Sequence, residues 1–69
     1  MVYEKGTKIR HRRTGAIEHI VGLCKIKWLG NWVDGVIYEG PDRHTGELTT
    51  FVRTRKEFND EFELIKDNE

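Results

Sequence analysis

The 69-residue sequence contains no serine, one cysteine, one proline and no long apolar run. Without serine the commonest hydroxyl nucleophile is missing, and a single cysteine excludes an internal disulfide framework. No apolar stretch approaches the roughly 20 residues that span a bilayer, and residues 1–5 lack the apolar region of a signal peptide. We therefore expect a soluble, cytoplasmic protein that does not associate with membranes.

The chain is also too short for more than one small core, because a domain of this size buries only about 60% of its unfolded surface. We expect one domain over residues 1–69, with residues 67–69 frayed. There is no repeat, no low-complexity tract and no linker that would divide it.

The formal net charge is zero, which argues against a globally basic protein that coats nucleic acid. That zero is a cancellation. Residues 1–28 carry seven basic and two acidic side chains, and residues 29–69 carry five basic and ten acidic ones. Folding can gather these charges on two separate faces or pair them across neighbouring strands. We favour pairing, because the two halves of a small barrel interleave in space.

Seven glycines divide the sequence at short intervals, a spacing typical of short strands joined by turns. The expected strands are 8–11, 16–28, 32–39, 47–53 and 63–66. Within the second, Cys24, Ile26 and Trp28 alternate with Lys25 and Lys27, which predicts an apolar face turned inward and a basic face turned outward. Gly22 interrupts this alternation and predicts a bulge or bend.

Before the last strand, the apolar residues change from the alternation of a strand to the spacing of a helix. Thr54 and Glu57 have the spacing of a helix capping box, and Phe58 and Phe62 would share one face of a short helix. Together these elements predict a mostly all-β fold, a small five-stranded SH3-like barrel with a helical turn before its last strand; an OB-like barrel is the alternative. The expected core residues are Tyr3, Ile9, Ile17, Val21, Cys24, Ile26, Val36, Tyr38, Val52, Phe58, Phe62 and Leu64.

Three segments, 10–15 (Arg-His-Arg-Arg-Thr-Gly), 36–39 (Val-Ile-Tyr-Glu) and 51–63, where Phe-Val-Arg leads to Glu57-Phe58 and Phe62-Glu63, carry a family resemblance. Over residues 8–66 the chain resembles small bacterial and phage domains with a Tyr-Arg-His-x-(Lys/Arg)-x-Gly opening, a Val-Val-Tyr strand and a (Phe/Trp)-Val-Arg-Pro strand. Ile9 and Thr54 depart from the Tyr and Pro of that pattern. The resemblance implies a compact β-rich domain of bacterial or phage origin. It supplies no activity, because the family has none assigned.

Catalytic and metal-binding chemistry have little support in the sequence. Cys24 lies on an apolar strand face, where a cysteine behaves as a small hydrophobic residue and not as an accessible thiolate. His11, His19 and His44 lack the short paired spacings of zinc sites. We therefore expect no enzyme, no cofactor and no metal site.

The leading functional hypothesis is a non-enzymatic protein-interaction module, an accessory or regulatory protein. Two tryptophans flank the turn at 29–31, and Trp, Tyr and Arg dominate the energetics of protein interfaces. Alternation turns Trp28 inward and leaves Trp32 beside the turn. The expected partner-binding residues are Leu29, Trp32, Val33, Lys25, Lys27 and Arg53.

The alternative is a small nucleic-acid-binding module, because clustered basic side chains contact phosphates and nearby exposed aromatics stack on bases. Its candidate residues are Arg10, Arg12, Arg13, Lys25, Lys27, Arg55 and Lys56. A homodimer is compatible with so small a core, but no sequence feature requires one.

Overall fold

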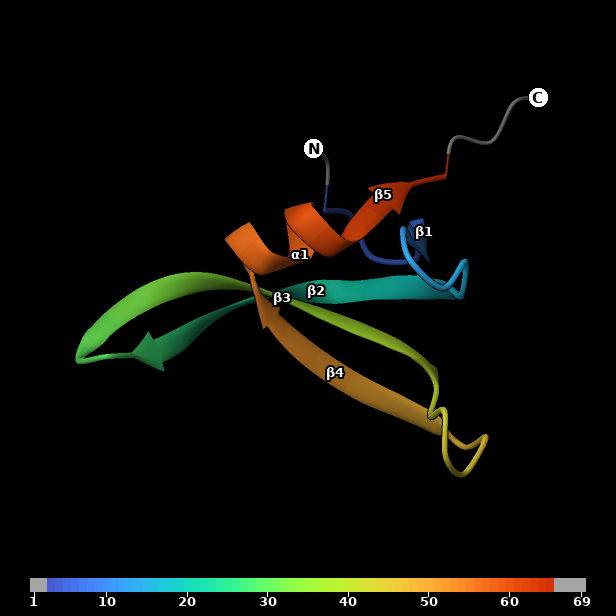
Figure 1. The fold of residues 1–69 in the computed structure, drawn as a ribbon. Helices are drawn as coiled ribbons and strands as arrows, with labels where there is room; N and C mark the ends of the chain where they lie inside the picture. Colours follow the sequence, from blue (N-terminus) through green and yellow to red (C-terminus); the bar gives the residue numbers. More distant parts are fainter. Residues whose placement is uncertain (1–2, 66–69) are drawn as a thin grey trace.

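The computed structural model describes residues 3–65, which form one antiparallel five-stranded sheet and one short helix (Figure 1). The elements are β1 (Lys8–His11), β2 (Ile17–Trp28), β3 (Asn31–Pro41), β4 (Leu48–Thr54), α1 (Arg55–Glu61) and β5 (Phe62–Leu64). The strand order is β4-β3-β2-β1-β5, so β4 and β5 lie at the two edges and the sheet is open. The mostly-β fold, with a helix before its last strand, is confirmed. Residues 67–69, expected to fray, lie outside the described residues.

The helix α1 begins where the sequence indicates. Thr54 is its N-cap, and the Thr54 hydroxyl accepts a hydrogen bond from the Glu57 amide at 3.2 Å. The Glu57 carboxylate in turn accepts a hydrogen bond from that hydroxyl at 3.2 Å, where a full capping box would use the backbone amide of the cap residue. The helix ends at Glu61, so Phe62 is the first residue of β5.

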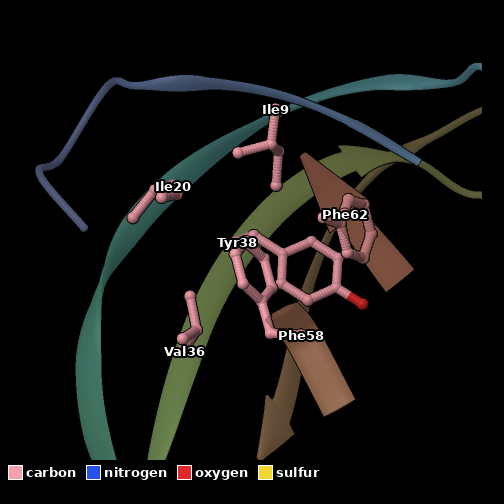
Figure 2. Close-up of a cluster of buried hydrophobic side chains, with 6 residues drawn as sticks. All are labelled: Ile9, Ile20, Val36, Tyr38, Phe58 and Phe62. Carbon is pink, nitrogen blue, oxygen red and sulfur yellow. The ribbon is translucent and has the colours of Figure 1, made fainter. Parts of the chain in front are cut away.

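Six buried side chains form the core on one face of the sheet (Figure 2). They come from β1, β2, β3, α1 and β5: Ile9, Ile20, Val36, Tyr38, Phe58 and Phe62. The ring centroids of Tyr38 and Phe62, and of Phe58 and Phe62, are each 4.9 Å apart. Full burial of such a side chain stabilises a fold by about 1.5–3 kcal/mol. This cluster therefore holds α1 and β5 against β3.

The residues Cys24, Ile26 and Trp28 lie on the opposite face of the sheet from this core, so their expected inward orientation is wrong. The register between β2 and β3 shifts between Ile20 and Gly22, which confirms the bulge expected there. An extra residue in one strand exchanges the two faces for the rest of that strand, because side chains alternate. Ile20 is therefore buried, whereas Trp28 is 52% exposed.

On this outer face, Cys24 and Ile26 pack over Gly35 of β3. A Cβ atom at Gly35 would lie 2.6 Å from Ile26 Cδ1 and 2.9 Å from Cys24 Sγ. The missing side chain of Gly35 thus makes room for both residues and leaves them half-buried.

Two other expected core residues, Ile17 and Val52, are exposed on the outer face. Ile17 lies opposite Arg10, and Val52 lies opposite Ile37. Because side chains alternate along a strand, these positions face away from the buried side of the sheet. Val21, beside the bulge, is half-buried. The core is therefore smaller than the sequence suggests, and part of the apolar content lies on the outer face.

Candidate functional site

The β2–β3 hairpin extends beyond α1, and its end exposes large apolar side chains (Figure 1). Trp28 pairs with Asn31, so a two-residue turn of Leu29 and Gly30 joins the strands. Both turn residues have positive φ, 49° for Leu29 and 84° for Gly30, as in a type I′ hairpin turn. Leucine rarely adopts this conformation, and the Leu29 side chain is 87% exposed. We call residues Trp28–Trp32 the hairpin tip.

One face of the hairpin combines basic and aromatic side chains. Lys27 lies opposite Trp32, with its Nζ atom 5.2 Å from the centroid of the ring, a cation–π contact. Trp32 nevertheless remains 65% exposed. The next pair along the hairpin, Lys25 and Asp34, forms an ion pair. The hydrogen bond and positive charge of Lys25, with a smaller effect of Arg55, hold the pKa of Asp34 below its usual value.

The other face of the hairpin carries Trp28 and Val33. These two residues, together with residues of α1, border a shallow pocket of about 530 Å³. It is lined by Trp28, Val33, Asp34, Thr54, Arg55, Lys56 and Asn59. The two tryptophans thus lie on opposite faces of one hairpin, and both are exposed. Trp32 borders the turn, as expected, and its ring is exposed.

The structure brings together most of the expected partner-binding residues but separates two of them. Leu29 and Trp32 lie at the hairpin tip, and Lys25 and Lys27 share the face of Trp32. Val33 lies on the opposite face. Arg53 lines a separate groove, where its Nε atom lies 3.5 Å from Glu61 Oε1.

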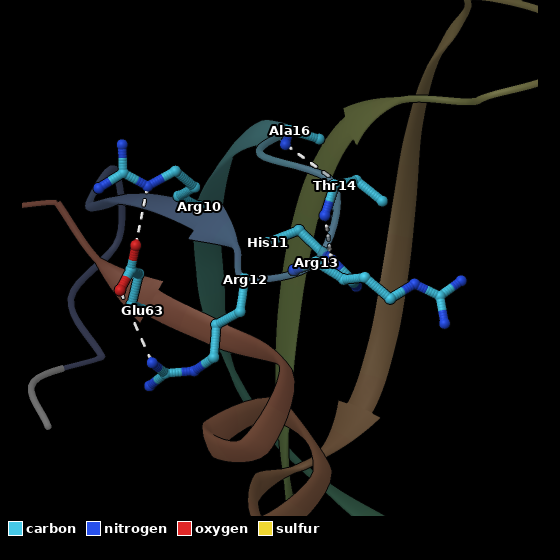
Figure 3. Close-up of polar contacts among 7 residues, drawn as sticks. All are labelled: Arg10, His11, Arg12, Arg13, Thr14, Ala16 and Glu63. Carbon is cyan, nitrogen blue, oxygen red and sulfur yellow. Dashed lines mark hydrogen bonds and ion pairs between the residues drawn. The ribbon is translucent and has the colours of Figure 1, made fainter.

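Four of the seven basic residues of the nucleic-acid alternative lie beside carboxylates. Glu63 lies between Arg10 and Arg12, with Arg10 Nε 2.8 Å from Glu63 Oε2 and an Arg12 guanidinium nitrogen 3.6 Å from Glu63 Oε1 (Figure 3). Asp34 is shared by Lys25 and Arg55. Each paired base of residues 1–28 therefore has its partner in residues 29–65. Folding interleaves the two oppositely charged halves of the chain.

A groove that the sequence did not indicate lies on the core side of the sheet. Its volume is about 720 Å³, and the β1–β2 turn, the β3–β4 loop and the end of α1 border it. Glu18 and Tyr38 contribute to its wall. Burial raises the pKa of Glu18, against an opposing effect of His11. Glu18 Oε1 is buried and has no hydrogen-bond partner among residues 3–65.

Gly40 makes room for this carboxylate, because a Cβ atom there would lie 2.5 Å from Glu18 Cγ. The sequence held a signal for this arrangement. Glu18 is two residues from the inward-facing Ile20, so strand alternation before the bulge turns an acidic side chain toward the core.

His11 builds the β1–β2 turn. Its Nδ1 atom accepts hydrogen bonds from the backbone amides of Arg13 and Thr14, each at 3.3 Å (Figure 3). Its ring meets the edge of Phe62 at a centroid distance of 5.0 Å. Within residues 3–65, no three His, Cys, Asp or Glu side chains are grouped closely enough to hold a metal ion. The one helix of this part of the chain is too short to cross a bilayer.

Comparison of the chain with protein families, curated proteins and solved structures found no match.

Proposed function

We propose that the chain is a non-enzymatic protein-interaction module that binds its partner through the hairpin tip. The observation that carries the proposal is Leu29, which is 87% exposed in a left-handed conformation. Asn or Gly would occupy this turn position without strain. Backbone strain at an exposed position indicates a function for the side chain itself. An exposed apolar side chain such as that of Leu29 can contribute to binding a partner.

The surroundings of Leu29 indicate the chemistry of the partner. Trp28 and Trp32 are half or more exposed on either side of it, and tryptophan is enriched among the residues that contribute most to binding at protein interfaces. The Nζ atom of Lys27 lies over the ring of Trp32. We infer a partner with an apolar cleft that accepts the tip and acidic residues at the rim that meet Lys27.

The order of the strands supports an SH3-like assignment. Four strands form a meander, and the fifth, after a helical turn, pairs with the first. We propose a partly open SH3-like barrel that serves as a cytoplasmic accessory or regulatory protein of a bacterium or phage.

Site-specific photo-cross-linking tests the proposed surface. A photoreactive residue replaces Asn31 at the tip in one variant and Arg43 in the β3–β4 loop in the control. Both positions are exposed, and Leu29 and Trp32 stay intact. We expect the Asn31 variant to cross-link one protein in the native cell, and that protein, once purified, to bind the unmodified chain. Equal cross-linking from both positions, or none from the tip, would contradict the proposal.

Nucleic-acid binding remains the second candidate. It is favoured by one feature, the groove on the core side, because the two turns at its rim carry Arg12, Arg13 and Arg43. Against it stand the carboxylates in the same groove, among them Glu18 and Glu61, which would repel a phosphate backbone.

A further inference from the structure

The two edges of the sheet differ in how they are protected. The β5 edge is three residues long, and Glu63 at its centre is held by two arginines. The β4 edge is seven residues long, Leu48–Thr54, and contains no proline, no lysine and no register shift. Leu48 is 72% exposed and Val52 49%. Folded proteins usually shield such an edge with one of these devices or cover it with another strand.

The pairing of β4 with β3 shows which backbone groups face outward. The Asp42 amide donates to the Glu47 carbonyl at 2.8 Å, which places residues 42 and 47 at a hydrogen-bonding position of the ladder. Hydrogen-bonded pairs alternate with non-hydrogen-bonded ones along an antiparallel ladder. Pro41, which has no N–H, then falls on a non-hydrogen-bonded pair with Leu48, as it must. By this alternation Thr49, Phe51 and Arg53 bond to β3.

The amides and carbonyls of Leu48, Thr50 and Val52 therefore point to the free edge, where no strand of residues 3–65 meets them. We propose that a second copy of this chain pairs with them, β4 against β4 in antiparallel orientation, about a two-fold axis at Thr50. In that register each Leu48 lies opposite Val52 of the second copy, and Thr50 lies opposite its own equivalent.

Complementary charges favour both this register and a second copy of the chain as the strand that pairs with β4. With the axis at Thr50, Arg53 lies opposite Glu47 of the second copy, and the symmetric contact repeats the pair. Arg53 would then lie between Glu47 of the second copy and Glu61 of its own chain, which is 3.5 Å from its Nε atom. An axis at Phe51 would place Arg53 opposite Thr49 and leave Glu47 without a partner strand residue. Threonine pairs and oppositely charged pairs directly opposite each other stabilise neighbouring strands. The paired segment thus has a basic residue at one end and an acidic residue at the other, so it matches an antiparallel copy of itself. The strand of another protein would need the same arrangement of charges.

This dimer leaves the hairpin tip free. Thr54, at the end of β4, pairs with Gly35, and the tip lies farther along the hairpin, beyond the paired segment (Figure 1). The dimer therefore presents two tips, which would raise its avidity for a multivalent partner. The inference does not rest on the proposed function of the tip.

Analytical ultracentrifugation from micromolar to near-millimolar concentration tests the dimer. We expect a monomer–dimer equilibrium for the native chain. Thr50→Lys sets like charges directly opposite each other and should weaken the dimer at least about tenfold. The control, His44→Lys, adds the same charge in the β3–β4 loop outside the paired segment and should leave the equilibrium unchanged. A chain that is monomeric throughout, or a dimer that tolerates Thr50→Lys, would overturn the proposal.

A charge exchange tests the register. Glu47→Lys should weaken the dimer, because it places a positive charge opposite Arg53 of the second copy. The double variant E47K/R53E should restore the dimer. Amide hydrogen exchange gives a reading that needs no variant. The amides of Leu48, Thr50 and Val52 should become protected as the concentration rises, whereas the amide of Leu29 should not. Protection of the tip in place of β4 would overturn the proposal.

Discussion

Lys25 of β2 and Asp34 of β3 lie directly opposite each other and form an ion pair. Arg10 and Glu63 form an equivalent pair between β1 and β5. Both pairs join the basic first half of the chain to the acidic second half. Within residues 3–65, opposite charges from the two halves thus meet across the sheet, and such pairing weakens the attraction that the paired bases exert on a polyanion.

We therefore expect no binding to nucleic acid at physiological salt. Fluorescence anisotropy of labelled single- and double-stranded oligonucleotides measures this directly, beginning at low salt. Binding that weakens steeply as salt is added would show release of counterions from phosphates. That result would support the nucleic-acid alternative and contradict our preference for a protein partner.

Leu29→Asn should stabilise the protein and abolish binding through the tip. Asn followed by Gly suits a type I′ turn, so the substitution relieves backbone strain of about 1 kcal/mol. Leu29→Ala is the matched control, because alanine keeps the unfavourable positive φ and also removes the apolar side chain. Urea denaturation should show a higher midpoint for the asparagine variant alone. An unchanged midpoint would show that Leu29 is not strained.

Gly40→Ala should destabilise the fold by about 1–3 kcal/mol, because the new methyl group collides with Glu18. Gly22→Ala serves as the control, since no atom lies within 4 Å of the position that its Cβ would take. The added variant E18A/G40A should recover much of the loss. Thermal denaturation compares the stability of Gly40→Ala, Gly22→Ala and E18A/G40A. Equal destabilisation by Gly40→Ala and Gly22→Ala would disprove the close contact with Glu18.

Glu18→Gln should stabilise the protein at neutral pH. The pKa of Glu18 is raised above 4.5 in the folded state, chiefly by burial, so the folded chain binds its proton more tightly than the unfolded chain does. Stability therefore falls as the pH rises from about 4.5 through the folded pKa, and glutamine removes this fall.

Denaturation curves of the Glu18→Gln variant and the native chain should converge below pH 4.5 and separate above it. Glu4→Gln changes an exposed carboxylate and is the control. A difference between Glu18→Gln and the native chain that stays constant with pH would show that burial of the charge is not its cause.

The sequence was sufficient to predict the strands, the helix start at Thr54 and the position of the bulge. It did not predict what the bulge does. The alternation of Cys24, Ile26 and Trp28 shows that one face of the strand is apolar. Whether that face points toward the core or away from it depends on the residue inserted near Gly22. The faces were therefore exchanged, and an apolar stripe expected in the core lies on the outer face.

The groove around Glu18 was missed for a related reason. Its wall combines β2 with Gly40 of β3 and the end of α1, which are distant in sequence and meet only when the sheet bends. The hairpin tip, in contrast, is local, so Leu29 and Trp32 were identified from neighbouring residues alone. Arg53 belongs to a separate groove, and the pairing of distant strands that puts it there cannot be read from neighbouring residues.

The most direct test of the central claim is the dissociation constant of the chain and the purified partner that cross-links to the tip. Isothermal titration calorimetry would compare the native chain, Trp32→Ala and R12A/R13A. Loss of an interface anchor costs about 2 kcal/mol or more, so we predict that Trp32→Ala weakens binding about thirtyfold. R12A/R13A should bind like the native chain. Native affinity in Trp32→Ala would contradict the assignment of the hairpin tip as the binding surface.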